Sequence, residues 1–382
     1  MQLNKLSIVA ATLLLAQSTL HAEDYVRVQY MQYTESDDRV EVIAPSLEVN
    51  KDFGSDYTLN VKLVGDMVSG ASPTYSDTSS GASTYNRGVV ANPSNINKQN
   101  IDFEEERAFA SVGLTKRFEN RDEMTLSYSK SYESDYDSNT FGLNYLKWLD
   151  DAKNRSLDMT LTYQNNIILI QECDPFNYAC SNSDALSGAS SEQDSNLIHL
   201  QLGYTQILDE SSVAKASIFY SKEEGYLSNQ YYNIVRNSNT VEAERKPDER
   251  TSYGFGLKYH KNFGALTTKL GYNYYSDDWE IDAHTVTIDN YYELNPSFTL
   301  GFGLRYYTQS EAQFYSEEIN FFTTQTIASM DDKMSEFDAM TYKLSLTYTQ
   351  NEKLSYDASI NYYDQSTDLS ATYFTAGIKY KF

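Results

Sequence analysis

Cysteine, basic residues and long apolar runs are scarce in this sequence of 382 residues. After the first segment, no stretch approaches the roughly 20 apolar residues that a membrane-spanning helix needs. The two cysteines, Cys173 and Cys180, have neither the Cys-x-x-Cys spacing of a redox pair nor the Cys-x-x-Cys-His pattern of a haem site. Only 30 basic residues face 54 acidic ones, and the net charge of −24 would repel nucleic-acid phosphates. These absences exclude a helical membrane anchor, a c-type cytochrome and a nucleic-acid-binding protein.

Residues 1–22 have the features of a secretory signal peptide. Lys5 gives a basic start, the run from Leu6 to Ala16 is apolar, and Leu20-His21-Ala22 suits cleavage by signal peptidase. The apolar run is too short to span a bilayer as a helix. We therefore predict that residues 1–22 are removed and that residues 23–382 form a single domain.

The two cysteines lie in one predicted loop, Cys-Asp-Pro-Phe-Asn-Tyr-Ala-Cys. A signal peptide directs the chain to an oxidising compartment, where two loop cysteines this close form a local disulfide. We therefore predict a disulfide between Cys173 and Cys180, with a redox-active pair as the alternative.

What is present is alternation. From Phe374 to Phe382, apolar residues alternate with Thr375, Gly377, Lys379 and Lys381. In a strand this period of two makes one face fit for lipid and the other for water. Strands cross a membrane only as a closed barrel, because lipid cannot satisfy the backbone groups of an open edge. The aromatic ending, Tyr380 and Phe382, resembles the assembly signal of bacterial outer-membrane barrels.

The whole chain repeats this pattern and predicts an all-β fold, a transmembrane antiparallel up-and-down β-barrel of about sixteen strands. A mean hydropathy of −0.56 does not oppose this, because barrels hide their apolar content in alternation. The 34 tyrosines suit membrane interfaces. The predicted strands are 25–34, 40–49, 57–67, 105–118, 123–131, 139–149, 156–168, 196–208, 213–222, 251–263, 265–276, 280–293, 297–309, 339–350, 353–363 and 371–382.

Connection lengths alternate along the chain. Every second connection is short, and the other set contains the four long ones, 68–104, 169–195, 223–250 and 310–338. Outer-membrane barrels have short periplasmic turns and long external loops, so both termini are predicted in the periplasm. The connection 68–104 is long enough to fold inward and constrict a pore.

Many basic residues fall on the polar register of their strands. The candidate lumen-facing residues are Arg27, Lys62, Arg107, Lys269, Arg305 and Lys343, together with Lys116, Lys215 and Lys258. One interpretation is that they bias permeation toward anions or zwitterions. The other is that they pair with inward acidic residues and hold the wall rigid; these are Glu41, Glu105, Asp158 and Asp289.

Several local motifs are shared along most of the mature chain with a known family. They are Asp38-Arg39, Asp66 with Ser69-Gly70-Ala71-Ser72-Pro73, Ser131-Tyr132-Glu133-Ser134-Asp135-Tyr136, Gly225-Tyr226-Leu227-Ser228, Arg245-Lys246-Pro247-Asp248, Tyr274-Tyr275-Ser276-Asp277-Asp278-Trp279, His284-Thr285, Arg305-Tyr306-Tyr307-Thr308-Gln309-Ser310 and Phe314-Tyr315. In these the chain resembles the domain of unknown function 3570 family of bacterial outer-membrane β-barrel proteins, although Gln230 stands where that family usually has proline. The resemblance implies a barrel and hints at extracytoplasmic redox partners.

Catalytic patterns are missing. After signal removal only His199, His260 and His284 remain, and no segment has the Ser and His arrangement of barrel phospholipases or the Asp and His residues of barrel proteases. Asp277 and Asp278 are predicted to stabilise a turn beside an interfacial tryptophan by accepting backbone hydrogen bonds. The alternative is that they form a cation-binding or acid–base site. We therefore predict no enzyme, and no catalytic, cofactor-binding or metal-binding residues.

The predicted function is a porin-like channel with a polar lumen in the outer membrane of a Gram-negative bacterium. The expected partners are outer-membrane lipid, lipopolysaccharide and the barrel assembly machinery. The alternative is a barrel scaffold or conduit for a periplasmic redox partner that carries flavin or haem.

Overall fold

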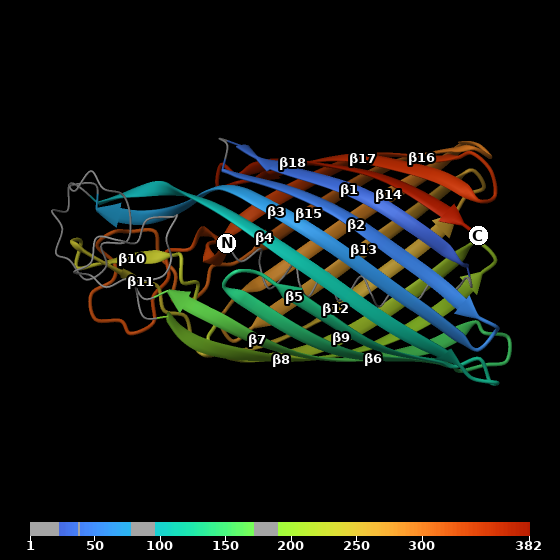
Figure 1. Cartoon of the computed structure of the whole chain (residues 1–382), viewed down its shortest axis with the longest axis horizontal. Helices are drawn as coiled ribbons and strands as arrows, with labels where there is room; N and C mark the ends of the chain where they lie inside the picture. The colour runs from blue at the N-terminus through green and yellow to red at the C-terminus, as the bar shows by residue number, and fades with distance from the viewer. Residues whose placement is uncertain (1–22, 37–38, 78–95, 172–189) are drawn as a thin grey trace.

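Sixteen antiparallel strands close into one barrel (Figure 1). The structure, a computed structural model, describes residues 23–36, 39–77, 96–171 and 190–382. Neighbouring barrel strands pair in chain order, and β1 (Tyr25–Glu35) closes the ring by pairing with β18 (Ser370–Lys381). The predicted fold class, strand number and strand order are confirmed.

The strand bounds extend most of the predicted ones by a few residues. The other strands in the first half of the barrel are β2 (Val40–Phe53), β3 (Tyr57–Asp77), β4 (Ile96–Arg117), β5 (Glu123–Tyr132), β6 (Tyr136–Trp148), β7 (Arg155–Gln171), β8 (Ser190–Asp209) and β9 (Ser212–Gly225). The second half continues with β12 (Glu249–Asn262), β13 (Leu266–Asp277), β14 (Asp282–Asn295), β15 (Phe298–Gln309), β16 (Phe337–Thr349) and β17 (Leu354–Gln365). A separate hairpin consists of β10 (Asn233–Arg236) and β11 (Thr240–Ala243).

The alternation predicted from sequence separates the two faces of the wall. On β7, Met159 is 54% exposed on the outside, whereas Asp158 is 8% exposed on the inner face. On β15, Phe302 is exposed outside, and Gly303 lies on the inner face beside the Asp289 carboxylate. A large apolar surface turned outward around a closed barrel is what a lipid environment stabilises.

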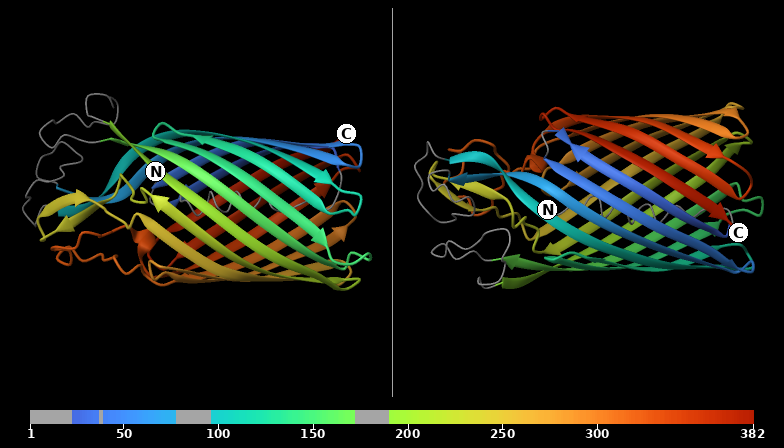
Figure 2. Two further views of the ribbon diagram at one scale, coloured as in Figure 1. Left: turned by 90° about the horizontal axis from the view of Figure 1, so that it is seen from below. Right: turned by 45° about the horizontal axis from the view of Figure 1, so that its top comes forward.

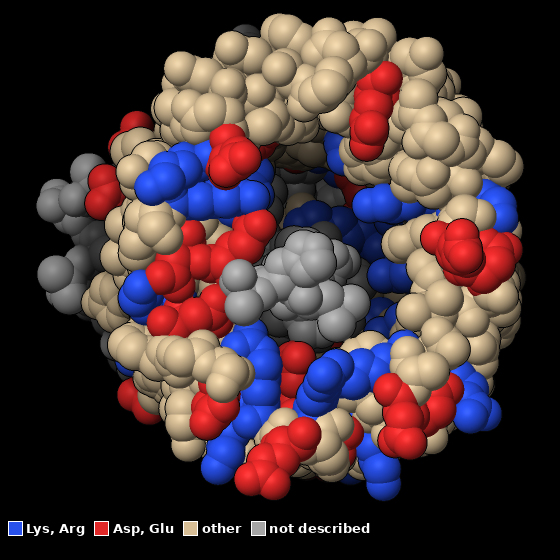
Figure 3. Space-filling model, turned by 90° about the vertical axis from the view of Figure 1, so that its right-hand side faces the viewer, with Lys and Arg blue, Asp and Glu red and all other residues tan. Residues whose placement is uncertain are grey.

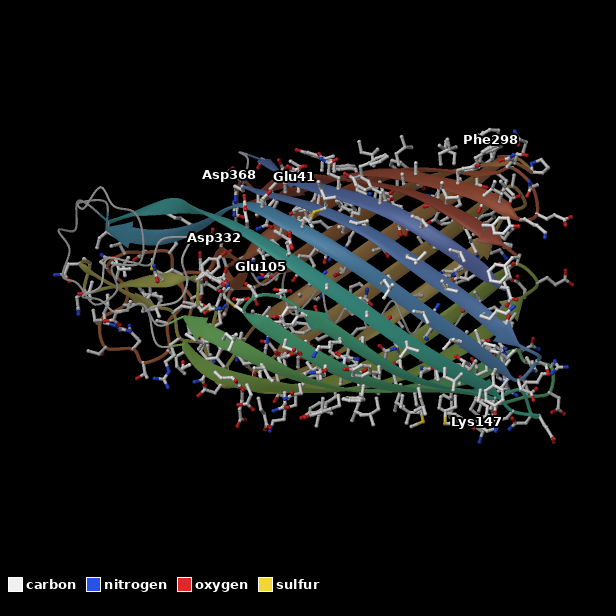
Figure 4. All side chains as sticks on the ribbon, in the orientation of Figure 1. Glu41, Glu105, Lys147, Phe298, Asp332 and Asp368 are labelled. Atoms are coloured by element: carbon white, nitrogen blue, oxygen red, sulfur yellow. The ribbon has the colours of Figure 1, made fainter. Side chains whose placement is uncertain are left out.

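The two ends of the barrel differ (Figures 1 and 2). One end, here the turn end, carries the short connections and the described chain ends, where the Phe382 amide donates to the Asp24 carbonyl at 3.2 Å. The opposite end, here the loop end, carries the long connections and the β10–β11 hairpin. Figure 4 places Glu105 and Asp332 toward the loop end, and Lys147 and Phe298 toward the turn end.

The predicted inward fold of 68–104 is wrong for the described parts of that connection. β3 continues to Asp77 and β4 begins at Ile96, and the two pair over this whole extension. Figure 1 shows the paired strands projecting past the barrel at the loop end. Continuous antiparallel pairing satisfies the backbone groups of both arms, so the ribbon extends in the strand direction.

Two loops at the loop end fold together into a small apolar unit, here the cap, formed by residues 226–248 and 310–336. Its core contains Val235, Phe322 and Met330, and Ile96 of β4 packs against them. Isolated bridges join Arg236 to Phe322 and Arg245 to Ala328. The helix η3 (Asp332–Met334), a single 3-10 turn, ends this segment. Within the described ranges, no helix is long and apolar enough to cross a membrane.

Candidate functional site

The inner wall of the barrel is the candidate site, because the predicted basic residues lie there. Arg27, for example, lies on β1 between Val26 and Val28, and Val28 is 53% exposed on the outside. Figure 3 looks into the barrel from the turn end and shows Lys and Arg side chains gathered along the inside of the ring. The six candidate residues come from β1, β3, β4, β13, β15 and β16.

Two of the six form ion pairs across the wall. Arg27 Nη2 lies 2.9 Å from Asp357 Oδ2 on β17. Arg107 on β4 pairs with Asp66, its direct register partner on β3. A third pair joins Lys215 Nζ on β9 to Asp158 Oδ1 on β7 at 2.6 Å. For these residues, the interpretation that basic residues pair with inward acidic residues and hold the wall rigid is correct.

Inward glycines let two of these pairs form across an intervening strand. Gly377 of β18 lies between Arg27 and Asp357, and a Cβ there would stand 2.9 Å from the Asp357 carboxylate. Gly203 of β8 lies between Lys215 and Asp158, and its Cβ would stand 2.4 Å from Asp158 Oδ1. These glycines were not predicted as site residues. The sequence pattern that could have identified them is a glycine at an inward position whose register partner on the next strand is an acidic residue.

The other four candidates, Lys62, Lys269, Arg305 and Lys343, form no ion pair with any described residue. Three of them lie over tyrosine rings: Lys269 Nζ is 4.9 Å from the Tyr291 centroid, and the Arg305 guanidinium is 5.1 Å from that of Tyr307. Lys343 Nζ is 6.0 Å from the same Tyr291 ring. Lys269, Arg305 and Lys343 on β13, β15 and β16 are here called the basic wall. None of the three forms an ion pair with a described residue, although the Asp289 carboxylate lies in register with Lys269.

The other three predicted basic residues lie elsewhere on the wall. Lys116 lies 5.7 Å from the Tyr57 ring centroid and 5.3 Å from that of Phe118. Lys258 of β12 is the direct register partner of Lys215 on β9. Among these three, Lys215 alone pairs with an acidic residue in the described part of the chain.

The predicted acidic residues differ in whether they pair with a basic residue of the wall. Asp158 pairs with a basic residue of the wall, Lys215, whereas Asp289 faces Lys269 in register without forming an ion pair. Glu105 accepts hydrogen bonds from the Ser134 amide at 2.9 Å and its hydroxyl at 3.0 Å, so it ties down a loop-end turn.

The prediction that Glu41 points inward is wrong. Glu41 accepts a hydrogen bond from Gln32 at 2.9 Å on the outer face, and Val40 and Val42 point inward instead. Those valines pack against Val68 in an apolar cluster inside the wall. Near the loop end, apolar residues of β2 therefore point inward and Glu41 points outward, because Val68, Met31 and Tyr33 cover the inward valines.

The family motifs near residue 277 form a structural turn around one buried carboxylate. Asp277 accepts from Arg250 Nη2 at 2.5 Å and from the amides of Trp279 and Ile281, each at 3.0 Å. The turn interpretation is confirmed, but Trp279 is only 4% exposed and lies 4.4 Å from the Arg250 guanidinium, so it is not interfacial. Asp278 accepts from the Thr251 amide at 3.0 Å.

A buried ion triad holds the cap together. Lys246 Nζ lies 3.0 Å from Glu244 and 3.1 Å from Asp331, and all three side chains are at most 7% exposed. Burial would lower the pKa of Lys246, but the two carboxylates outweigh it and raise that pKa. Burial raises the pKa of Glu244. Burial acts likewise on Asp331, but Lys246 and Lys333 outweigh it and hold its pKa below the usual range.

The remaining predicted residues have varied surroundings. His199 is buried against Phe219 at 5.7 Å between centroids, and neither ring nitrogen has a hydrogen-bond partner in the part of the chain that the structure describes. His284 Nδ1 lies 2.8 Å from the Tyr272 hydroxyl.

Tyr380 and Phe382 are exposed at the turn end. The predicted signal peptide and the pair Cys173 and Cys180 lie outside the described residues and stay predictions.

Closure, an outward apolar face and a charged inner wall together define an outer-membrane-type β-barrel. The chain belongs to the family described as "Protein of unknown function (DUF3570)", which matches residues 4–377, so the resemblance seen in the motifs is confirmed. No curated protein sequence matches the chain.

Solved barrels resemble the fold at very low sequence identity. CdiB from Acinetobacter baumannii has a TM-score of 0.51 at 8% identity, covering 94% of this chain and 60% of that one. The bacterial polysaccharide outer membrane secretin has a TM-score of 0.50 at 8% identity, covering 95% and 100%. A ferric enterobactin receptor (PfeA) structure from Pseudomonas aeruginosa has a TM-score of 0.47 at 8% identity with 90% of this chain covered, and this chain spans about half (54%) of its length. The first two likenesses show the fold alone.

Proposed function

We propose that this protein is a porin-like channel in the outer membrane of a Gram-negative bacterium and that it favours anions. The observation that carries the proposal is the basic wall, whose three cations have no ion-pair partner among the described residues. Uncompensated charge inside a low-dielectric wall concentrates ions of the opposite sign and selects among permeating solutes. A barrel of sixteen strands is wide enough to hold an aqueous lumen.

In the proposed orientation the turn end and both termini face the periplasm, and the loop end faces outward. Short turns on the periplasmic side are general for such barrels. Tyr380 and Phe382 at the turn end then meet the assembly machinery. Lipid and lipopolysaccharide surround the exposed apolar face. The cap and the β3–β4 ribbon form the external surface.

Reconstitution of the mature barrel in planar bilayers tests the channel. Folded protein is first identified by its heat-dependent migration on gels. We expect stable ion-conducting steps from that fraction. Folded protein without conductance contradicts the proposal. If that protein also co-purifies with a flavin- or haem-carrying protein, the result favours the alternative, a conduit for a redox partner.

A further inference from the structure

A recess of about 240 Å³ lies in the inner wall, on strands other than β13, β15 and β16 of the basic wall. Its lining comes from seven consecutive strands, β18 and β1 to β6. The hollow exists because small side chains, Ala44 and Ser46 of β2, stand where neighbouring strands carry larger ones such as Met31 and Phe109. The recess opens into the lumen, so a passing solute reaches it.

The lining separates into an apolar part and a hydroxyl part. Met31 is the register partner of Ala44, and Val64 that of Phe109, so apolar pairs cover β1 to β4. On β5 and β6, the paired positions are Ser131 with Ser138 and Ser129 with Thr140, which form two rungs of hydroxyls. A ligand in this recess therefore contacts an apolar surface on one side and hydroxyl groups on the other.

Hydrogen-bond donors in and beside the recess lack acceptors. Ser131 is 6% exposed and lines the recess, and its hydroxyl has no hydrogen-bond partner within the described ranges. Lys62 also lines it and forms no ion pair with a described residue. Its register partners are Glu48 on β2 and Ser111 on β4, and the Ser111 hydroxyl has no hydrogen-bond partner among the described residues. Buried polar groups without partners are rare in native proteins and call for a ligand or water.

The charge of the recess is positive. Lys62 and Arg107 line it with one acidic residue, Asp66. Asp66 engages Nε and Nη2 of Arg107, which leaves Nη1 without an acceptor among the described residues. Cationic donors of this kind bind carboxylates by charge-assisted hydrogen bonds.

We propose that the recess is a binding site for a small organic monocarboxylate with a compact apolar body. The carboxylate binds Lys62, Arg107 Nη1 and the Ser131 hydroxyl, and the body packs on Met31, Val64 and Phe109. A cavity of about 150 Å³ is enough to hold benzene, so the recess has room for such a body together with its carboxylate. The assignment rests on the proposed channel, because it names the solute class that the channel carries.

Direct binding to the detergent-solubilised mature barrel tests the site without requiring conductance. Saturation-transfer NMR with benzoate as the probe is expected to show binding, whereas benzyl alcohol, which has a similar body and no charge, binds at least about tenfold more weakly, the loss expected for one charge-assisted hydrogen bond. Equal binding of the two probes, or binding of neither, overturns the site.

Three variants locate the binding. Lys62→Gln should weaken benzoate binding about tenfold by the same reasoning, and Ser46→Leu should abolish it by filling the recess. Lys343→Gln is the matched control, since it removes an unpaired lysine from the basic wall, and it should leave binding unchanged. Loss of binding in Lys343→Gln with none in Lys62→Gln overturns the assignment.

Conductance is measured on the same samples and separates the two proposals. Benzoate binding without any conductance contradicts the channel and leaves the site standing. Conductance with no benzoate binding leaves the channel standing and removes the site.

Discussion

Arg27 on β1 binds Asp357 on β17 at 2.9 Å although β18 lies between the two strands. The bridge passes over Gly377, whose missing side chain leaves the carboxylate room. The pair of Lys215 with Asp158 has the same construction over a glycine of β8. Such bridges link strands that share no backbone hydrogen bonds. They neutralise part of the inner charge, so the field left in the lumen comes from residues that lack a bridge.

Gly203→Ala tests whether these bridges set the free charge. The new Cβ would lie 2.4 to 2.7 Å from the Asp158 carboxylate atoms, so that carboxylate must turn away from Lys215. We expect an assembled barrel with a changed ion preference, because Lys215 and Asp158 then act on the lumen as separate charges; the change is measured as a shift of the reversal potential in a salt gradient. Gly113→Ala is the matched control, because its nearest contact would be an ordinary 3.9 Å. Equal behaviour of the two variants would show that the bridge does not influence permeation.

The alternation of apolar and polar residues in the sequence was sufficient to predict the barrel itself. A strand such as β7 exposes every second residue to lipid, and this pattern specifies both its faces and its register. It failed at Glu41, where the inside of the wall is apolar and polarity no longer marks the lumen. The ends of β3 and β4 were also missed, because past the barrel the strand pattern has no lipid face to impose alternation.

The inner-wall site was predicted only as a set of residues. Register placed Arg27, Lys215 and Lys269 on the inner wall, but pairing depends on what lies on the next two strands. Lys215 finds Asp158 across a glycine, whereas Lys269 lies over the ring of Tyr291. The recess could not be predicted, because it results from small side chains on several strands that the closed sheet brings side by side.

Lys246→Met should open the cap without harming the barrel. The substitution leaves Glu244 and Asp331 buried without their cation, and breaking a buried pair costs about 3 to 5 kcal/mol. Hydrogen exchange by mass spectrometry should show faster exchange in 226–248 and 310–336, with unchanged protection of the barrel strands. Lys353→Met, in a turn-end connection, is the control and should change neither region. Protection of the cap equal to that of the unchanged protein would rule out a stabilising role for the triad.

The triad also predicts how cap stability depends on pH. The lowered pKa of Asp331 gives stability that is present above its unfolded pKa of about 3.9 and is lost as pH falls through the folded value. The raised pKa of Lys246 gives stability that is present below about pH 10.4 and is lost as pH rises through the folded value. Glu244 acts oppositely to Asp331, since its raised pKa favours the folded cap at low pH.

Cap protection in the unchanged protein should therefore fall below about pH 4. In Lys246→Met it should rise between pH 7 and pH 5, because protonation then relieves two unpaired buried carboxylates. Hydrogen exchange at matched intrinsic rates measures both trends. Parallel pH profiles for the two proteins would be incompatible with a lysine-centred triad.

The predicted disulfide should matter little for assembly. A bridge closing so short a loop stabilises by at most about 2 to 3 kcal/mol, whereas the closed hydrogen-bonded wall holds the barrel. We expect Cys173→Ser with Cys180→Ser to keep heat-dependent migration and to make the loop easier to cut by external protease. Free thiols in protein from the periplasm, or loss of the barrel on substitution, would contradict the predicted pairing.

The reversal potential of single channels in a salt gradient tests most directly whether the basic wall controls permeation. The mature barrel should prefer chloride over potassium, because Lys269, Arg305 and Lys343 of the basic wall form no ion pair with a described residue. The triple variant Lys269→Gln, Arg305→Gln and Lys343→Gln should lose that preference while conductance persists. A folded barrel that prefers potassium, or a triple variant with the unchanged reversal potential, would contradict the claim that the basic wall controls permeation.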